Sequence, residues 1–168
     1  LIEAATKTRI LLVLLEGLYC TGGFENPLRT EQRRFESKTV QAYLKLVEEA
    51  QRAARVAPLV RVGLAPHSVR AVPAQMLSEI AQFAQSHNLV VHMHLSEQPL
   101  EVAQCIETYG CSPIALAARC GILSPQFTAV HATHLEPGDI ELLASSQSSV
   151  CACPSTEANL GDGFLPAS

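Results

Sequence analysis

The sequence of 168 residues lacks three features that would each indicate a partner or a compartment. Its longest apolar run near the start, residues 10–15, is far shorter than the roughly 20 residues that a membrane-spanning helix needs. No cationic leader with a cleavage site precedes this run, so we expect a cytoplasmic protein. Basic residues cluster no further than Arg33 and Arg34, and the formal net charge is −4. These absences argue against a membrane or a nucleic-acid partner and favour a small-molecule ligand.

Paired cysteines of the CxxC type, which bind metals or form redox centres, are also missing. The six cysteines are scattered, mostly in apolar contexts, and we expect reduced thiols in the core rather than disulfides or metal ligands. Aromatic residues make up 5% of the chain, while hydrophobic residues make up 48%. A chain of this length and hydrophobicity can bury a sizeable core, so we expect a globular protein. No linker or charge block divides it, which indicates one domain or part of one.

Apolar segments of two kinds alternate along the sequence. Short β-type runs are followed by segments with helical spacing, such as Met76, Ile80 and Phe83 after the helix-start residue Pro73. This alternation predicts an α/β protein with a parallel sheet, helices packed outside it, and strands buried on both faces. The expected strands are 9–15, 59–65, 89–95, 127–131 and 148–153; the expected helices are 36–56, 73–87, 99–110, 112–121 and 137–146, and the residues after 153 are expected to form a loop.

Polar side chains interrupt this alternation at the carboxyl ends of the expected strands. In a parallel α/β barrel these ends meet at one mouth, where catalytic residues gather. A single histidine at a strand end is more often structural, but several at successive ends favour an active site. In an extended segment His92 and His94 point the same way, and Glu97 lies just beyond them, where a carboxylate could move the proton of an activated water. The residues at the other strand ends are Tyr19, His67, His131, Ser155 and Thr156.

Four segments in a particular order and spacing carry a resemblance to a known family. They are GLAPHSVRAV (63–72), VHMHLSEQPLEV (91–102), VHATHL (130–135) and CPSTEANLGDG (153–163). Together they resemble the amidohydrolase superfamily, and within it the deiminases of N-formimino-L-glutamate in bacterial histidine degradation. The resemblance implies a portion of a metal-dependent (β/α)8 TIM-type barrel. About five βα units are expected here, in a single partial catalytic domain over residues 1–168 that lacks the first and the final strands.

The resemblance also assigns roles to five residues. Members of the family bind one divalent metal, usually zinc, and His94 matches a metal ligand on the fifth barrel strand. Glu97 matches the glutamate that transfers a proton, and His131 matches the histidine that orients or polarises the attacking water and the reacting carbon. His67 and Arg70 match residues that contact the substrate, and a guanidinium suits a bidentate contact with a carboxylate.

Two further histidines receive no such role. His92 is expected to brace His94 from outside the set of metal ligands, and His134 is expected to be a loop residue. Other metal ligands of the family, an HxH pair and an aspartate, have no match here, since Asp162 lies in a loop motif. A complete barrel needs roughly 200 residues or more, and a zinc site normally needs at least three protein ligands. We therefore expect the remaining ligands outside these residues, and we expect the isolated chain to be inactive.

The implied reaction is the hydrolysis of N-formimino-L-glutamate to N-formyl-L-glutamate and ammonia. The complete protein is expected to act on this small molecule as a homodimer. One alternative is a related amidohydrolase that deaminates a purine, pyrimidine or triazine-like amidine; it would need a flat pocket lined by aromatic residues, which the 5% aromatic content disfavours. Another alternative is a catalytically silent fragment that serves as an assembly module, which would hold no stoichiometric, tightly bound zinc.

Overall fold

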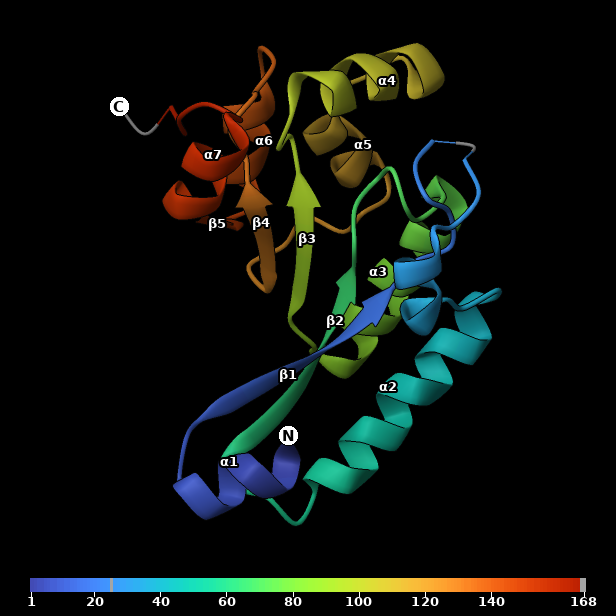
Figure 1. Ribbon diagram of the computed structural model, residues 1–168, viewed down its shortest axis with the longest axis vertical. Coiled ribbons are helices and arrows are strands. Elements are labelled where there is room, and N and C mark those ends of the chain that lie inside the picture. The colour runs from blue at the N-terminus through green and yellow to red at the C-terminus, as the bar shows by residue number, and fades with distance from the viewer. Residues whose placement is uncertain (25, 167–168) are drawn as a thin grey trace.

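The computed structural model describes residues 1–24 and 26–166, which form a parallel sheet of five strands alternating with helices. The sheet order is β1-β2-β3-β4-β5, and every neighbouring pair is parallel. Strands that are neighbours in the chain are therefore neighbours in the sheet, as in the wall of a barrel, and Figure 1 shows their directions turning from one to the next. The strands are β1 (Leu12–Leu18), β2 (Val60–Pro66), β3 (Val91–Leu95), β4 (Phe127–His131) and β5 (Ser149–Cys151).

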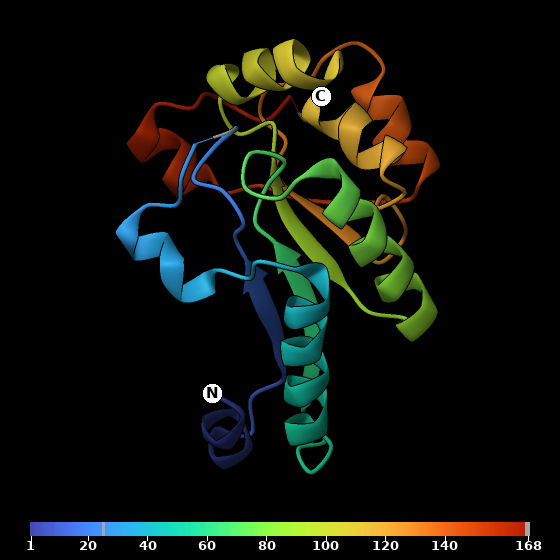
Figure 2. The ribbon, with the colours of Figure 1, turned by 90° about the vertical axis from the view of Figure 1, so that its right-hand side faces the viewer.

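Helices connect the strands, and α2 and α3 lie side by side along the outside of the first part of the sheet (Figure 2). Among the described residues, no helix is both long and apolar enough to cross a membrane. The helices are α1 (Ile2–Thr8), the 3-10 helix η1 (Thr30–Phe35), α2 (Val40–Ala54), α3 (Ala74–His87), α4 (Pro99–Tyr109), α5 (Pro113–Arg119), α6 (Asp139–Ser145) and α7 (Pro154–Leu160).

Local chemistry explains where several helices begin and end. The hydroxyl of Thr39 accepts a hydrogen bond from the N–H of Ala42 and begins α2, as an N-cap residue does. Proline stands in the first turn of α4, α5 and α7, where its missing N–H costs no helical hydrogen bond. Asn88 ends α3 and Gly110 ends α4, both with positive φ, which these residue types tolerate best.

The first strand begins and ends three residues later than the apolar run predicts. All seven of its residues pair with β2, from Leu12 beside Val60 to Leu18 beside Pro66. The strand continues through Gly17, where a Cβ would lie 3.4 Å from Cδ1 of Phe35, so the glycine leaves room for that ring. Pairing and packing thus override the local apolar pattern, which favours an earlier strand.

The expected loop after residue 153 is wrong, because α7 (Pro154–Leu160) forms there. Ser155 and Thr156 consequently lie in a helix and not at a strand end. Pro154 suggests a break in regular structure, yet it occupies the first turn of this helix, and Gly161, with φ 72°, ends it.

The two faces of the sheet differ. In β3, Val91, Met93 and Leu95 are buried, whereas the alternating His92 and His94 are half-buried. β4 alternates in the same way, and β5 is exposed along its length. The expectation that every strand is buried on both faces is therefore wrong, because the histidine face lines a cavity rather than a packed layer.

The 168-residue chain produced alone is expected to self-associate. In the described residues β1 and β5 are the edge strands, and edge strands offer backbone N–H and C=O groups to other strands. Size-exclusion chromatography with light scattering is expected to show dimers or larger species. Val13→Lys, at a β1 side chain that is 49% exposed, should shift the chain toward monomer, while Leu46→Lys on α2, at a residue 44% exposed, should not. A monodisperse, active monomer of the unsubstituted chain would contradict this expectation.

Candidate active site

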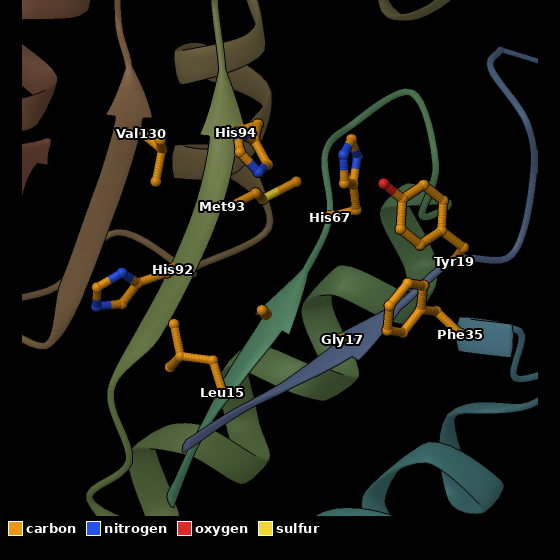
Figure 3. A pocket seen from close by; sticks show the side chains of 10 residues that line it. Leu15, Gly17, Tyr19, Phe35, His67, His92, Met93, His94 and Val130 are labelled. Carbon is orange, nitrogen blue, oxygen red and sulfur yellow. The ribbon is translucent and has the colours of Figure 1, made fainter. Parts of the chain in front are cut away.

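Three of the expected site residues meet at the carboxyl ends of β2, β3 and β4. His67 directly follows β2, His94 lies in β3, and His131 ends β4. The ring centroids of His67 and His94 are 4.8 Å apart, and those of His94 and His131 are 5.2 Å apart. Figure 3 shows His67 and His94 at the rim of one cavity. These three histidines therefore lie close together at one edge of the sheet, and of the three His67 and His94 line the cavity.

Glu97 joins this cluster from the loop after β3. Its Oε1 lies 3.3 Å from Nε2 of His131, and its Oε2 accepts a hydrogen bond of 3.0 Å from Nη2 of Arg70. The same Nε2 of His131 lies 3.1 Å from Nδ1 of His94. The side chain of Glu97 is only 14% exposed, so these interactions are weakly screened by water. All five expected site residues therefore belong to one connected group.

The guanidinium of Arg70 contacts carboxylates of the protein itself. Besides its hydrogen bond to Glu97, its Nε lies 3.9 Å from Oε2 of Glu101. That Nε is buried and has no hydrogen-bond partner among the described residues. A buried N–H without an acceptor is unfavourable. The sequence did not indicate that Arg70 and Glu97 would pair.

Glu101 is a site residue that the sequence analysis missed. It stands in the first turn of α4 and is 1% exposed. Its two carboxylate oxygens accept hydrogen bonds from the N–H groups of Ser96 at 3.3 Å and of Glu97 at 3.1 Å. Ser96 has a φ of 53°, so the carboxylate stabilises a left-handed backbone just before Glu97. Burial raises the pKa of Glu101, while the charge of Arg70 opposes that rise. A glutamate in the first turn after a helix-start proline is the signal that could have identified it.

His131 is held through its second nitrogen as well. Its Nδ1 lies 3.2 Å from Oε1 of Glu157, and the N–H of Cys153 donates to the same oxygen at 3.0 Å. The backbone of His131 has a φ of 76° and that of Ala132 a φ of 54°, which is strained for residues other than glycine. The N–H of Ala132 donates to the carbonyl of Leu95 at 3.0 Å and holds this conformation.

The cysteines are free among the described residues, as expected, but only Cys105 and Cys120 are buried and Cys151 is exposed. Cys153 lies beside the candidate site. One ligand atom each from His131, Cys153 and Glu157 lie within 4.8 Å of one another, a group whose chemistry suits a divalent metal. Cys153 was expected to be a core thiol and not a ligand, so this proximity is a feature that the scattered spacing of cysteines concealed.

Burial lowers the pKa of two of the clustered imidazoles. Burial, followed by the nearby His94 and Arg70, lowers the pKa of His67 to about 3. Burial and His131 also lower the pKa of His94. Neutral imidazole is the form that binds a metal ion. The imidazole of His94 is therefore a suitable ligand for a divalent metal.

The cluster opens into a cavity of about 300 Å³. Figure 3 shows Tyr19, Phe35 and Leu15 lining it together with the histidines. The ring of Tyr19 lies 4.2 Å from that of His67, centroid to centroid. His92 also lines this cavity, and no hydrogen bond among the described residues joins it to His94, so the expected bracing contact is not observed. His134 lies in a loop, as expected.

Comparison with known proteins connects this geometry to a family. Residues 2–168 match the Amidohydrolase family. The chain belongs to the amidohydrolase family. It is 38% identical to formimidoylglutamate deiminase of Pseudomonas aeruginosa over 167 residues, which are 98% of this chain and 36% of that protein. It is 35% identical to 5-methylthioadenosine/S-adenosylhomocysteine deaminase of Nitratidesulfovibrio vulgaris over 106 residues, which are 63% of this chain and 24% of that protein. The amidohydrolase chain thus spans well under half the length of these relatives.

Solved structures of amidohydrolases share its fold. An amidohydrolase of Brucella melitensis superposes with a TM-score of 0.88 at 32% identity, over 99% of this chain and 37% of that one. An adenosine deaminase of Xanthomonas campestris with bound zinc superposes with a TM-score of 0.71 at 31% identity, over 76% of this chain and 29% of that one. The expected fold class, a portion of an amidohydrolase (β/α)8 barrel, is confirmed.

Replacing Glu101 by alanine is expected to destabilise the complete protein by about 2–4 kcal/mol, because two buried N–H groups lose their acceptor. Urea denaturation measures this change. Glu107→Ala, at an exposed residue of the same helix, removes the same charge without that loss and should stay within about 0.5 kcal/mol of the unsubstituted protein. Equal stabilities of the two variants would show that the Glu101 carboxylate does not hold the loop before Glu97.

Proposed function

We propose that the complete protein containing this chain is a cytoplasmic, zinc-dependent deiminase that hydrolyses N-formimino-L-glutamate to N-formyl-L-glutamate and ammonia. The observation that carries this proposal is the position of Arg70, whose guanidinium lies 3.0 Å from Glu97 at the mouth of the histidine cluster. A cation this close to the candidate proton-transfer group suits a substrate with a carboxylate near its reacting carbon. The similarity to formimidoylglutamate deiminase over 98% of the chain supports the same substrate.

Each residue of the cluster has a role in this reaction. A divalent metal held by His94, together with ligands from the rest of the protein, supplies Lewis-acid activation of water when bound. Glu97 accepts the two protons of the attacking water in turn and passes them to the leaving nitrogen. His131, whose Nε2 is 3.3 Å from Oε1 of Glu97, orients the water and polarises the formimino carbon. The oxygen of water stays on that carbon as the formyl oxygen, the carbon–nitrogen bond breaks, and ammonia leaves.

Arg70 and His67 bind the glutamate part of the substrate in this proposal. The side chain of Arg70 is 24% exposed, and its guanidinium would bind a carboxylate of the substrate. His67 is neutral, because its pKa is lowered to about 3, and its Nδ1 lies 3.0 Å from the hydroxyl of Ser68. Its Nε2 is therefore the nitrogen left for a neutral hydrogen bond to the substrate.

Deamination of an adenosine-type nucleoside is a second candidate that one observation favours. The rings of Tyr19 and Phe35 stand with centroids 6.1 Å apart and both line the cavity. The low aromatic content of the chain predicted no aromatic lining of the cavity, but two of its few aromatic side chains line it. The deaminase from Nitratidesulfovibrio vulgaris and the adenosine deaminase structure are consistent with this alternative. The proximity of Arg70 to Glu97 favours the acidic substrate over the nucleoside.

Ammonia release from the complete protein distinguishes the two substrates. N-formimino-L-glutamate is expected to be hydrolysed and 5′-deoxyadenosine not. Arg70→Lys should raise KM for N-formimino-L-glutamate by about tenfold or more and lower kcat less, since a bidentate contact becomes a point charge. Arg61→Lys on β2, at an exposed residue outside the cluster, is the control and should leave both constants unchanged. If the protein hydrolyses the nucleoside in preference and its KM does not change in Arg70→Lys, the second candidate function would be favoured instead.

Metal content tests the remaining alternative, a silent assembly module. The complete protein is expected to contain one tightly held zinc per chain by elemental analysis, and to lose activity on chelation and regain it with zinc. His94→Ala should remove that zinc, whereas His87→Ala, at an exposed histidine of α3, should retain it. A complete protein without stoichiometric metal would favour the assembly module. It stays a prediction that residues 1–168 form a single partial catalytic domain. It also stays a prediction that the complete protein is a homodimer.

A further inference from the structure

Glu157 is a buried carboxylate that the proposed reaction does not use. It is 3% exposed and lies on α7, in the segment expected to be a loop. Among the described residues no lysine or arginine pairs with it; its hydrogen-bond donors are Nδ1 of His131 at 3.2 Å and the N–H of Cys153 at 3.0 Å, both on Oε1. A buried carboxylate is stable only when donors surround it, so the interaction with His131 is important to both residues.

Capping of α7 explains only one of these two contacts. A carboxylate in the first turn that accepts the N–H of the preceding Cys153 resembles half of a capping box. That function needs no imidazole nearby. His131 is itself 2% exposed, and its ring is directed at Glu157 by a strained backbone with a φ of 76°. Strain of this kind persists where the surroundings hold the residue in place, and it often accompanies function.

The carboxylate determines which nitrogen of His131 carries the proton. A carboxylate only accepts hydrogen bonds, so it selects the tautomer with a proton on Nδ1. Carboxylates face both ring nitrogens, since Oε1 of Glu157 lies 3.2 Å from Nδ1 and Oε1 of Glu97 lies 3.3 Å from Nε2. Glu97 already accepts a hydrogen bond from Nη2 of Arg70 at 3.0 Å, whereas no lysine or arginine among the described residues pairs with Glu157. The buried Glu157 therefore depends on the proton of Nδ1 more than Glu97 depends on a proton of Nε2. With the proton on Nδ1, the lone pair of Nε2 faces Nδ1 of His94 at 3.1 Å and Oε1 of Glu97 at 3.3 Å.

We propose that Glu157 is a positioning residue for His131, which it holds in the Nδ1–H tautomer and with its Nε2 directed at Glu97 and the attacking water. This inference rests on the proposed function for its effect on turnover, because only then does Nε2 meet a reacting molecule. Glu157 itself lies on the far side of the ring and acts through His131. Partners placed in this way behind a functional histidine typically contribute 10-fold to 100-fold to activity.

The test compares Glu157→Gln with Ala158→Ser in the complete, zinc-loaded protein. Glutamine has the same shape but can turn its NH2 toward Nδ1, so both tautomers become accessible. Glu157→Gln is expected to lower kcat for N-formimino-L-glutamate by about 10-fold to 100-fold and to change KM less than about twofold. Ala158→Ser, at an exposed residue of the same helix, should change neither. A kcat unchanged by Glu157→Gln would overturn the proposal.

Nitrogen-15 NMR of histidine-labelled protein tests the tautomer without any substrate. The His131 signals are assigned by loss in His131→Asn, and Nδ1 of the unsubstituted protein should show a directly bonded proton, whereas Glu157→Gln should show a mixture. A proton on Nε2 alone in the unsubstituted protein would overturn the proposal even if Glu157→Gln fails to fold. If the protein lacks deiminase activity but His131 carries its proton on Nδ1, the proposed function fails and the tautomer assignment stands.

Zinc titration tests the competing use of the same atoms. If His131, Cys153 and Glu157 bound a metal together, a second zinc equivalent would appear that Cys153→Ser removes, and Nδ1 would carry no proton. That result would overturn the proposal. The expected result is a zinc stoichiometry that Cys153→Ser leaves unchanged.

Discussion

Parallel pairing of β3 with β4 is the interaction on which the candidate site depends. Its register places Leu95 beside His131 and His94 beside Val130, so the two strands end at the same level. Because parallel strands run in one direction, the polar side chains at their carboxyl ends meet at one edge. A slip of one residue would turn His94 toward the helices and bring a core side chain to the cavity. The alternation of buried and half-buried side chains along β3 therefore determines both the packing of the strand and the position of His94, the candidate metal ligand.

The same structural arrangement occurs twice around this pair of strands. In α4 and again in α7, an acid in the first turn bends back onto the loop before the helix. Glu101 holds the backbone of Glu97, and Glu157 holds the ring of His131. Each acid is buried and satisfied by N–H donors, so it rigidifies a neighbour at the cavity without facing the cavity itself. Glu97 and His131, the two residues with proposed roles toward the attacking water, are thus each held by a carboxylate behind them.

Much of this arrangement follows from the sequence, and the parts that do not have physical causes. β4 matches the predicted range of 127–131, and the histidines at strand ends lie together, because the period-2 alternation and the end of an apolar run are local signals. α7 was not predicted, since a short segment between Pro154 and Gly161 resembles a loop until the packing of Glu157 is known. The contact between Arg70 and Glu97 joins residues 27 positions apart, and no local pattern reports a pairing that depends on how two loops are folded.

The distance along the chain between His131 and Glu157, 26 residues, has a consequence for the order of folding. During synthesis, a nascent chain that has emerged only as far as β4 carries His131 without its carboxylate. β5 must join the sheet and α7 must dock before the ring has a partner on both sides. Among the described residues, every other hydrogen bond or ion pair within the cluster joins residues up to 131, so the contact with Glu157 is the last of them that synthesis makes possible.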